Sequence, residues 1–364
     1  MISTNESLYI AVDIGGTTIK MGICAPSAAL ASDSDSSAGS SSGLSDLWVC
    51  RSVIPTDTED HGKNILSDIA AEISRLTQEA GISTDRIQGL GIGVPGPVIT
   101  AKAVGEGAAA EQRQLVNGCV NLGWEGLVDV IAQMRSMTGI KHICLLNDAN
   151  AAALGEYWFG PAGRPSGSAV MVAIGTGIGC GIIEGKGIIE GTFGAAGEIG
   201  HMPITPAHPF FRHLREADPS IPERSDLEHF VSAINIARLA QRALETSDDP
   251  SQLRANMPLT AKALFDAAKK GDEFALRVTD FFFDTLAQGL ASVTSVIDPD
   301  LYIIGGGLSG AGDFLLNGVK DSYQRLVFPP SMGTAFRLAE LGNDAGLLGS
   351  IVPLIVNYEA NNDI

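Results

Sequence analysis

Several features that are common in other proteins are missing from this 364-residue sequence. Basic residues are scarce, with 24 lysines and arginines against 42 acidic residues, so the formal net charge is −18. Such an acidic surface repels nucleic-acid phosphates and anionic lipid headgroups, which makes nucleic acid and membranes unlikely partners. No apolar run approaches the roughly 20 residues of a membrane-spanning helix, and residues 1–7 form no signal region. We therefore expect a soluble, cytoplasmic protein.

Cysteine is rare and scattered. The five cysteines never occur in Cys-x-x-Cys spacing, and none follows Cys180. This pattern predicts reduced thiols rather than a disulfide framework.

Two common nucleotide-binding motifs are also absent. No Gly-x4-Gly-Lys-Ser/Thr occurs, which excludes a P-loop. Gly91, Gly93 and Gly96 fit Gly-x-Gly-x-x-Gly, but prolines flank the last glycine and no helix is expected to start there. Without a helix N-terminus facing a pyrophosphate, a Rossmann-type site is not predicted.

Glycine, in contrast, is abundant, and its positions reveal an internal repeat. A strand over residues 8–14 leads into the turn Gly15-Gly-Thr-Thr18 and a second strand over 19–24. The pattern returns 160 residues later, so that Val12 corresponds to Val172 and a second strand–turn–strand contains Gly175-Thr-Gly-Ile-Gly179. The repeat predicts two duplicated α/β lobes with a central cleft between them. Residues 26–46 are expected to form a flexible Ser-rich insertion.

Apolar periodicity predicts the remaining elements. Leu127, together with Val130 and Met134, indicates a helix, and another follows Asp148. The predicted strands cover 47–54, 87–94, 143–146 and 301–304, and the predicted helices cover 64–80, 226–244, 260–270, 272–297, the segment from 313 and the C-terminal segment to about 358.

The two glycine turns are candidates for holding phosphate groups. In such turns, successive backbone N–H groups can face one anion, and threonine hydroxyls add donors. Asp13 ends the first strand, where a carboxylate can hold a metal-bound water beside the phosphates, and Lys20 lies on the next strand. The alternative is that both turns are ordinary hairpins. Their duplication favours the phosphate site.

Three acidic or imidazole-bearing segments are candidates for substrate chemistry. Asp148 follows an apolar strand and begins a helix, so a catalytic base and a helix cap are equally good interpretations. Glu198 and His201 are three residues apart between glycines and can share one turn, although a buried structural histidine is the more common case. Glu228 has its own competitor, because Ser225-Asp-Leu-Glu228 fits a capping box.

Taken together, these segments resemble the ROK family (repressors, open reading frames, kinases), and most of all its bacterial-type glucokinases. The matching stretches occur in the family order along nearly the whole chain: Val12-Asp-Ile-Gly-Gly-Thr-Thr-Ile-Lys20, Gly91-Ile-Gly-Val-Pro-Gly-Pro97, Asn121-Leu-Gly-Trp124, Leu146-Asn-Asp-Ala-Asn-Ala-Ala152, Ile174-Gly-Thr-Gly-Ile-Gly179, Gly197-Glu-Ile-Gly-His201, Leu227-Glu228, Gly305-Gly-Gly307 and Ala345-Gly346.

The resemblance implies an actin-like ATPase-domain (ribonuclease H-like) fold. Residues 1–144 plus 345–364 would form the N-terminal lobe, and residues 145–344 the C-terminal lobe. It also implies phosphoryl transfer from ATP, with Mg²⁺, to the 6-hydroxyl of a hexose such as glucose, and a homodimer as the family's usual assembly.

The resemblance also assigns roles to individual residues. Asp148 would be the base. Sugar hydroxyls would be bound by Asn121, Asn147, Glu198, His201 and Glu228, with Gly96 contributing backbone. Mg-ATP phosphates would be held by Asp13, Gly15, Gly16, Thr17, Thr18, Lys20, Gly175, Thr176 and Gly177, with Mg²⁺ near Asp13 and the adenosine near Gly305, Gly306 and Gly307.

One departure from the family pattern is clear. The family usually has a Cys-x-Cys-Gly-x-x-Gly-Cys zinc site after the Gly-His pair, with that histidine as the fourth ligand. Here no cysteine is available, so we expect no structural zinc and a longer Pro-rich loop over residues 202–224. The sugar is therefore left open among glucose, fructose, mannose, N-acetylmannosamine and N-acetylglucosamine, as is ATP against polyphosphate. A sugar-sensing protein without catalysis and an actin-like ATPase without a sugar are the rival classes.

Overall fold

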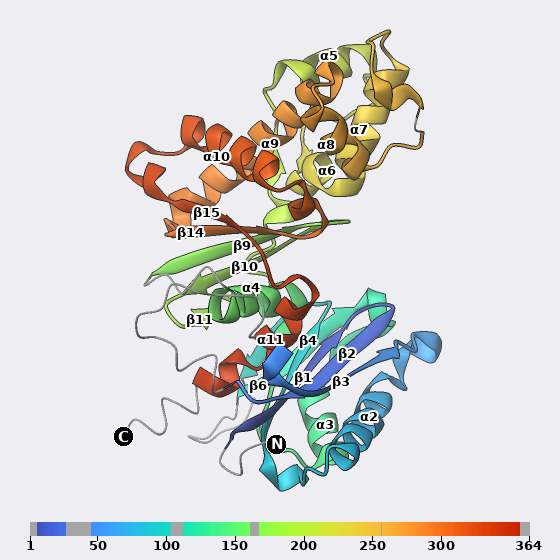
Figure 1. Cartoon of the computed structure of the whole chain (residues 1–364), viewed down its shortest axis with the longest axis vertical. Helices are drawn as coiled ribbons and strands as arrows, with labels where there is room; N and C mark the ends of the chain where they lie inside the picture. The colour runs from blue at the N-terminus through green and yellow to red at the C-terminus, as the bar shows by residue number, and fades with distance from the viewer. Residues whose placement is uncertain (1–5, 27–44, 103–111, 161–166, 256, 357–364) are drawn as a thin grey trace. The chain divides into compact units, whose positions relative to one another are not determined.

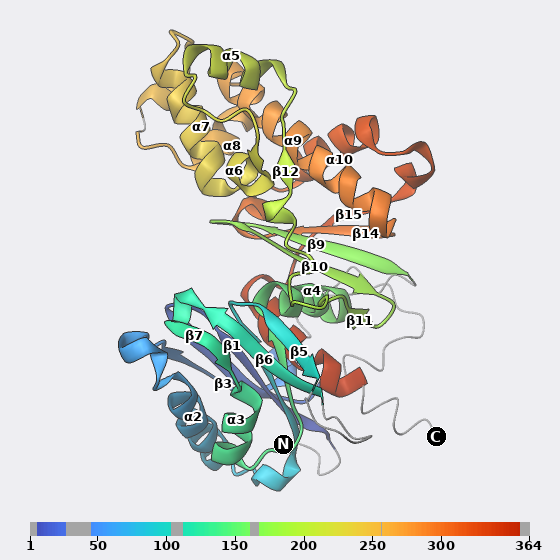
Figure 2. The same ribbon diagram turned by 180° about the vertical axis from the view of Figure 1, so that it is seen from behind.

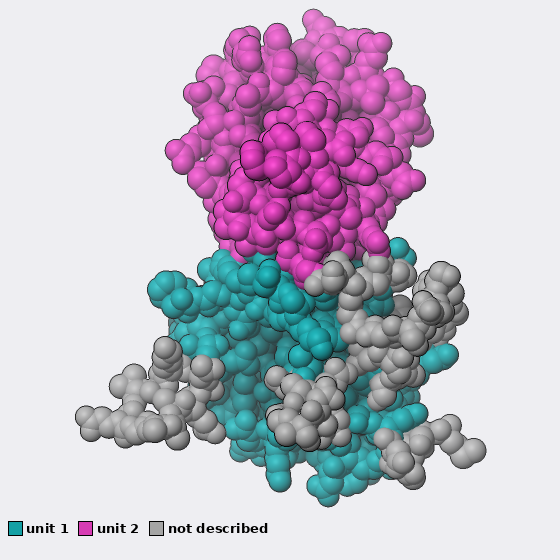
Figure 3. All heavy atoms as spheres, turned by 90° about the vertical axis from the view of Figure 1, so that its left-hand side faces the viewer, with its two compact units in different colours: residues 1–164, 181–196, 340–364 teal, residues 165–180, 197–339 magenta. Residues whose placement is uncertain are grey.

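The computed structural model describes residues 6–26, 45–102, 112–160, 167–255 and 257–356. The Ser-rich insertion expected at residues 26–46 lies outside them except at its ends. The chain forms two compact units, one of residues 1–164, 181–196 and 340–364, the other of residues 165–180 and 197–339 (Figure 3). This division differs from the expected lobe boundaries at 144/145, because residues 143–147 form a strand of the first unit's own sheet.

The first unit is built on a five-stranded sheet of order β3-β2-β1-β4-β8. Strands β1, β2 and β3 pair antiparallel, whereas β1, β4 and β8 run parallel. Helices α2 and α3 cover one face, and α4 and α11 cover the other (Figure 1). The bounds are β1 Leu8–Ile14, β2 Thr18–Cys24, β3 Trp48–Pro55, β4 Ile87–Val94, β8 Ile143–Asn147, α2 Ile65–Glu79, α3 Val130–Thr138, α4 Asp148–Phe159 and α11 Ala345–Ser350.

Helices α4 and α11 approach each other unusually closely, and glycines make this approach possible. A Cβ on Gly155 would lie 2.0 Å from the carbonyl oxygen of Ala345, and one on Gly349 would lie 1.6 Å from that of Ala151. The first glycine of the Gly-x-Gly-x-x-Gly match has a similar packing role. A Cβ on Gly91 would lie 2.2 Å from the carbonyl oxygen of Ser350.

A second, antiparallel sheet of the first unit was not predicted. It has the order β5-β6-β7, with β5 Val98–Lys102, β6 Gln112–Cys119 and β7 Trp124–Val128 (Figure 2). The helix expected around Leu127 begins later, at Val130, because Asp129 caps α3 by accepting the N–H of Ala132. Leu127 belongs to β7, and its side chain is 59% exposed. The helical reading of Leu127 was therefore wrong.

The second five-stranded sheet has the order β11-β10-β9-β14-β15. Its strands repeat the first sheet, with an antiparallel hairpin followed by parallel neighbours, and β1 and β9 share the burial pattern of five buried residues, one intermediate and one buried. This confirms the internal repeat. The bounds are β9 Ser168–Ile174, β10 Ile178–Glu184, which passes into the first unit after Cys180, β11 Gly187–Ile188, β14 Leu301–Gly305 and β15 Ala335–Leu338.

Helices of the second unit pack around the long helix α9, Glu273–Ile297. The helix predicted over 226–244 is two helices, because the buried Ser232 is extended and separates them. The segment 202–224, expected to be a loop, contains helix α5 between the short paired strands β12 and β13. The bounds are α5 Pro209–Ala217, α6 Leu227–Val231, α7 Ala233–Glu245, α8 Ala261–Lys269, α10 Asp313–Leu326, β12 Pro203–Ile204 and β13 Ser225–Asp226. Among the described helices, none has the length and apolar composition to span a membrane.

Candidate active site

At the junction between β8 and α4, the cap residue of the helix and the candidate catalytic base are two adjacent residues. Asn147 is the cap of α4, and its Oδ1 accepts the backbone N–H groups of Ala149 at 3.0 Å and Asn150 at 3.3 Å. The Nδ2 group of Asn147 donates to the carbonyl oxygen of Gly96 at 3.2 Å. Asp148 is the first helical residue, and it is exposed. The cap position therefore belongs to Asn147, while the Asp148 Oδ1 atom also accepts the N–H of Ala149, at 2.8 Å.

Asp148 lies near other predicted substrate-binding groups of the first unit. It directly follows Asn147, whose Nδ2 group bonds to the Gly96 carbonyl oxygen. A Cβ on Gly96 would lie 3.5 Å from the Cys119 sulfur. Gly96 and Asp148 therefore belong to one local cluster at the carboxyl end of β8.

Asn121 links this region to the first glycine turn. A Cβ on Gly16 would lie 3.5 Å from the carbonyl oxygen of Asn121, and the Asn121 side chain is exposed. A candidate sugar-binding residue and a candidate phosphate-binding turn are thus neighbours within one unit.

Asp13 lies in a space kept open by glycines. A Cβ on Gly346 or on Gly93 would come within 3.6 to 3.7 Å of its carboxylate atoms. Burial raises the pKa of Asp13, and the Lys20 ammonium, 3.8 Å from the carboxylate, opposes that rise. Asp13 and Lys20 are cross-strand partners in the β1–β2 hairpin. A partly buried carboxylate beside one cation, with glycines around it, suits a hydrated Mg²⁺.

Each glycine turn is closed by an internal backbone hydrogen bond, which spans three residues in the first turn and two in the second. The N–H of Gly15 donates to the carbonyl of Thr18 at 3.0 Å, and the N–H of Gly175 donates to that of Gly177 at 2.9 Å. Gly16, Thr17 and Thr18 of the first turn and Thr176 of the second are exposed. The turns therefore present exposed backbone and hydroxyl groups, as phosphate binding requires. At the position equivalent to Asp13, the second copy has Ala173, so only one hairpin carries a carboxylate.

Glu228 does not form the expected capping box. Asp226 takes the cap position of α6, no side-chain cap bond forms, and Ser225 belongs to β13. The Glu228 Oε2 atom instead accepts the backbone N–H of Ile178 at 2.8 Å, directly after the second glycine turn. A Cβ on Gly177 would lie 2.5 Å from the same oxygen. Glu228 thus holds the second turn in place, and the capping-box alternative was wrong.

Glu198 and His201 lie on one short turn, as their spacing predicts. The N–H of His201 donates to the carbonyl of Glu198 at 3.1 Å, and both side chains are exposed. The His201 Nδ1 atom lies 3.6 Å from the Asp226 carboxylate. An exposed imidazole with a carboxylate beside it is not the buried structural histidine that was the alternative.

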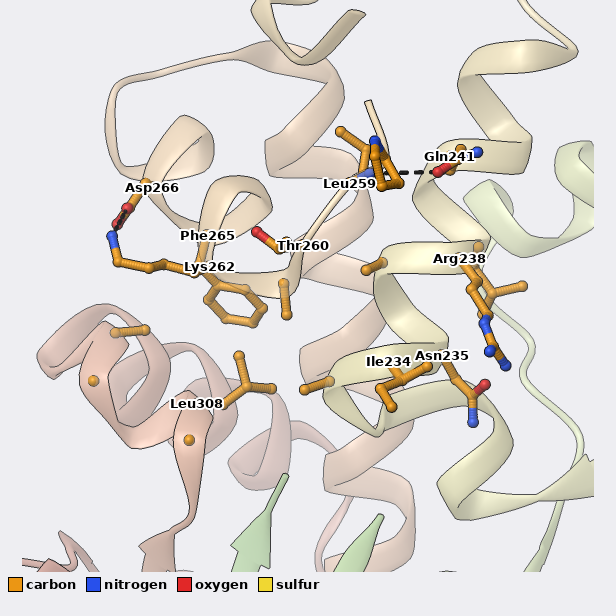
Figure 4. Close-up of a pocket in the computed structure, with 18 of the residues that line it drawn as sticks. Ile234, Asn235, Arg238, Gln241, Leu259, Thr260, Lys262, Phe265, Asp266 and Leu308 are labelled. Atoms are coloured by element: carbon orange, nitrogen blue, oxygen red, sulfur yellow. Dashed lines mark hydrogen bonds and ion pairs between the residues drawn. The ribbon is translucent and has the colours of Figure 1, made fainter. Parts of the chain in front are cut away.

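The predicted adenosine segment opens onto a cavity that the sequence did not predict. Gly306 has φ of 80°, and a Cβ there would lie 2.5 Å from the Ile174 backbone, so only glycine fits this turn. Gly307 lines a cavity of about 990 Å³ among α7, α8 and residues 307–311 (Figure 4). Its walls combine apolar and polar groups, including Ile234, Asn235, Arg238, Leu259, Thr260, Lys262, Phe265 and Leu308. These residues come from helices whose amphipathic pattern indicates only burial, so no sequence signal identified them.

The zinc site that the family usually has lacks its ligands in the described part of this chain. Within the described part of the chain, no group of three or more His, Cys, Asp or Glu side chains is arranged to hold a metal ion. All five cysteines are free, and burial raises the pKa of the Cys144 thiol to about 12. His201 lies beside Asp226, and His208 contacts Asp280 instead.

The predicted site residues therefore fall into two sets. The first unit carries Asp13, the first glycine turn, Lys20, Gly96, Asn121, Asn147 and Asp148. The second unit carries the second glycine turn, Glu198, His201, Glu228 and Gly305 to Gly307.

Comparisons with known proteins agree with this architecture. A model of the ROK family matches residues 9–354. A glucokinase of Halalkalibacterium halodurans is 33% identical over 352 residues, covering 95% of this chain and 94% of the relative. A glucokinase of Thermotoga maritima is 30% identical over 350 residues, covering 94% and 95%.

A solved structure is similar along nearly its whole length as well. It is a ROK family glucokinase from Streptomyces griseus in complex with glucose and AMPPNP, with 26% identity, a TM-score of 0.63 and coverage of 94% of this chain and 97% of that one. The duplicated sheets and this likeness confirm the actin-like α/β fold. Because the family model and the relatives span both units, this chain belongs to the ROK family.

Proposed function

We propose that this protein transfers the γ-phosphoryl group of ATP to the 6-hydroxyl of a hexose, with glucose as the first candidate. Two relatives similar over more than nine-tenths of the chain are glucokinases, and the Streptomyces griseus protein binds glucose and AMPPNP. Kinases for fructose, mannose, N-acetylmannosamine or N-acetylglucosamine are the alternatives.

One observation carries the proposal: Asn147 takes the cap position of α4, and Asp148 is the first helical residue, whose Oδ1 accepts the N–H of the adjacent Ala149 at 2.8 Å. Asp148 is exposed at the carboxyl end of a parallel strand, where ligands bind in open α/β sheets. Phosphoryl transfer needs a carboxylate that orients the attacking hydroxyl and accepts its proton. We assign that role to Asp148.

The remaining groups of the first unit would position the reactants. Asn121 would bind a sugar hydroxyl beside the phosphate-binding turn at Gly16. The resemblance assigns Asn147 to binding a sugar hydroxyl, but both ends of its amide already have partners. Its Oδ1 caps α4, and its Nδ2 bonds to Gly96. We therefore propose that Asn147 mainly fixes Asp148 and the Gly96 backbone relative to each other.

The phosphate groups would be bound by the exposed parts of the two glycine turns, with Lys20 as a cation. Asp13 would hold Mg²⁺ through its water ligands, and the ion would neutralise charge on the transferred phosphoryl group. In the second unit, Glu198, His201 and Glu228 would bind the remaining sugar hydroxyls.

ATP is favoured over polyphosphate as the donor by the cavity next to Gly307. A polyphosphate chain carries no apolar part, whereas a nucleoside needs a concave, partly apolar site. Leu308, Leu259 and Phe265 supply apolar walls, and Asn235 and Thr260 supply groups for hydrogen bonds.

Replacing Asp148 by asparagine tests the assignment of the base. The variant Asp148→Asn should fold and bind sugar but lose at least about a hundred-fold in kcat, because a general base contributes on that scale. A coupled assay with Mg-ATP across a panel of hexoses, with sugar binding followed by calorimetry, measures both effects.

A matched control is Asp313→Asn, which removes the carboxylate from the first residue of α10. This variant should keep its activity. Near-normal turnover of Asp148→Asn would disprove the role of the base, and a wild-type protein that phosphorylates none of the sugars would disprove the kinase proposal.

A further inference from the structure

Helix α5 lies in the chain between strands β12 and β13, which adjoin the predicted sugar-binding residues of the second unit. Strands β12 and β13 pair through Pro203 with Asp226 and through Ile204 with Ser225. The pairing continues where the N–H of Leu227 donates to the carbonyl of Met202 at 2.8 Å. The chain thus enters α5 shortly after His201 and returns shortly before Glu228.

An aromatic cluster fixes α5 against α6 and α9. The ring of Phe211 stacks on Phe281 of α9, with centroids 5.5 Å apart and planes at 8°. The same ring meets Phe230 of α6 edge-on, at 5.2 Å and 81°. Phe211 is 2% exposed, and the other two rings are fully buried. Because Phe230 lies two residues after Glu228 on a helix of only five residues, its position limits where Glu228 can lie.

A polar contact fixes the start of α5. The His208 Nδ1 atom accepts the N–H of Phe210 at 3.2 Å, so His208 must carry its proton on Nε2. The Nε2–H group then donates to the Asp280 carboxylate at 3.0 Å. We call Phe211, Phe230 and Phe281, with the His208–Asp280 pair, the α5 brace.

Helix α5, which carries Phe211, lies in the segment in which the family pattern has its zinc ligands. The histidines of this segment have other partners, since His208 is engaged as above and His213 contacts the carbonyl of Pro209 at 2.8 Å. His229 packs edge-on against Phe230, with ring centroids 5.5 Å apart. The residues present do not fit a zinc centre, but they do connect the two strands rigidly.

We propose that the α5 brace is a metal-free positioning device, in which Phe211 holds Glu228 and His201 in place for the sugar. This inference rests on the proposed sugar-kinase function. Glu228 is the link, since its Oε2 atom bonds to Ile178 and its own backbone belongs to the helix that Phe230 anchors. Loosening the brace lowers the affinity for the sugar more than the affinity for the nucleotide, because Phe211 does not line the nucleotide cavity.

Kinetics of Phe211→Ala test the proposal. The KM for the sugar should rise by about ten-fold or more and clearly more than the KM for ATP, because Glu228 would bind the sugar directly but acts on the phosphates only through the second glycine turn. Phe211→Leu should restore most of the sugar affinity, because it keeps much of the buried volume.

Phe336→Ala is the matched control. Phe336 is a mostly buried aromatic residue of the same unit that packs on Tyr302 and Tyr323, away from α5. It should lower the melting temperature to a similar degree while leaving the sugar KM unchanged. If Phe211→Ala does not fold, His208→Ala, which removes only the cap and the Asp280 contact, should still raise the sugar KM.

The outcomes separate the two proposals. A wild-type protein that phosphorylates no sugar refutes the proposed function, and the brace proposal falls with it. An active wild type whose sugar KM is unchanged in Phe211→Ala and His208→Ala refutes the brace alone. Stoichiometric zinc in the purified protein, with a higher sugar KM after its removal by a zinc-selective chelator, also refutes it.

Discussion

At the β8–α4 junction, a difference of one residue determines which side chain takes the helix-cap position and which is available for catalysis. Asn147 and Asp148 are both good helix caps by residue type, and sequence alone does not choose between them. In the structure, Asn147 has the extended backbone of a cap, and Asp148 is already helical. The carboxylate is thereby placed at the end of the sheet, where its Oδ1 accepts the N–H of Ala149.

Glu190 provides a test of pH dependence at the residue scale. Its Oε1 atom is buried without a hydrogen-bond partner among the described residues, and burial raises its pKa above the ordinary 4.5. The folded protein therefore binds this proton more tightly than the unfolded chain. The resulting stability is complete below about pH 4.5 and is lost as the pH rises through the raised pKa.

Glu190→Gln should accordingly stabilise the first unit by about 1 kcal/mol near pH 7 and have no effect near pH 4. Urea unfolding followed by tryptophan fluorescence measures this, because Trp48, Trp124 and Trp158 all belong to that unit. The exposed Glu184 supplies the control Glu184→Gln, which should be neutral. Equal stability of Glu190→Gln and wild type at both pH values would contradict the interpretation.

At the scale of elements, the crossing of α4 and α11 depends on the absence of side chains. Gly155→Ala would place a methyl group 2.0 Å from the Ala345 carbonyl oxygen. The helices would have to separate, and we expect the first unit to lose about 1 to 3 kcal/mol of stability, the usual cost of overpacking.

The same fluorescence-detected unfolding measures this loss. Gly187→Ala is the control, since its nearest neighbouring atom would be 4.0 Å away and its backbone does not require glycine. If Gly155→Ala is as stable as Gly187→Ala, the close helix crossing is not a constraint on the fold.

At the scale of the whole molecule, the charge of −18 separates the kinase proposal from a DNA-binding regulator. Binding to DNA is driven largely by release of counterions when basic residues neutralise phosphates, and this chain has few of them. We expect no gel shift of double-stranded DNA at low salt, with or without hexose. A sugar-dependent shift that weakens as salt is added would instead favour the regulatory branch of the family.

Features that rest on local pattern could be predicted from the amino-acid sequence. The repeat of strand, glycine turn and strand predicted two equivalent sheets, since period-two apolar runs and glycine turns are local signals. The motif order predicted the family, and the residue types at Asp13 and Asp148 suggested phosphate and proton chemistry.

The partners of the polar groups became known from the three-dimensional contacts alone. The tertiary structure assigned the cap to Asn147, joined Glu228 to Ile178, and turned the expected loop at 202–224 into a helix held by Phe211. It also formed the sheet β5-β6-β7 and the cavity beside Gly307. These features depend on contacts between residues distant in the chain, whose energies exceed local preferences but leave no periodic trace in the sequence.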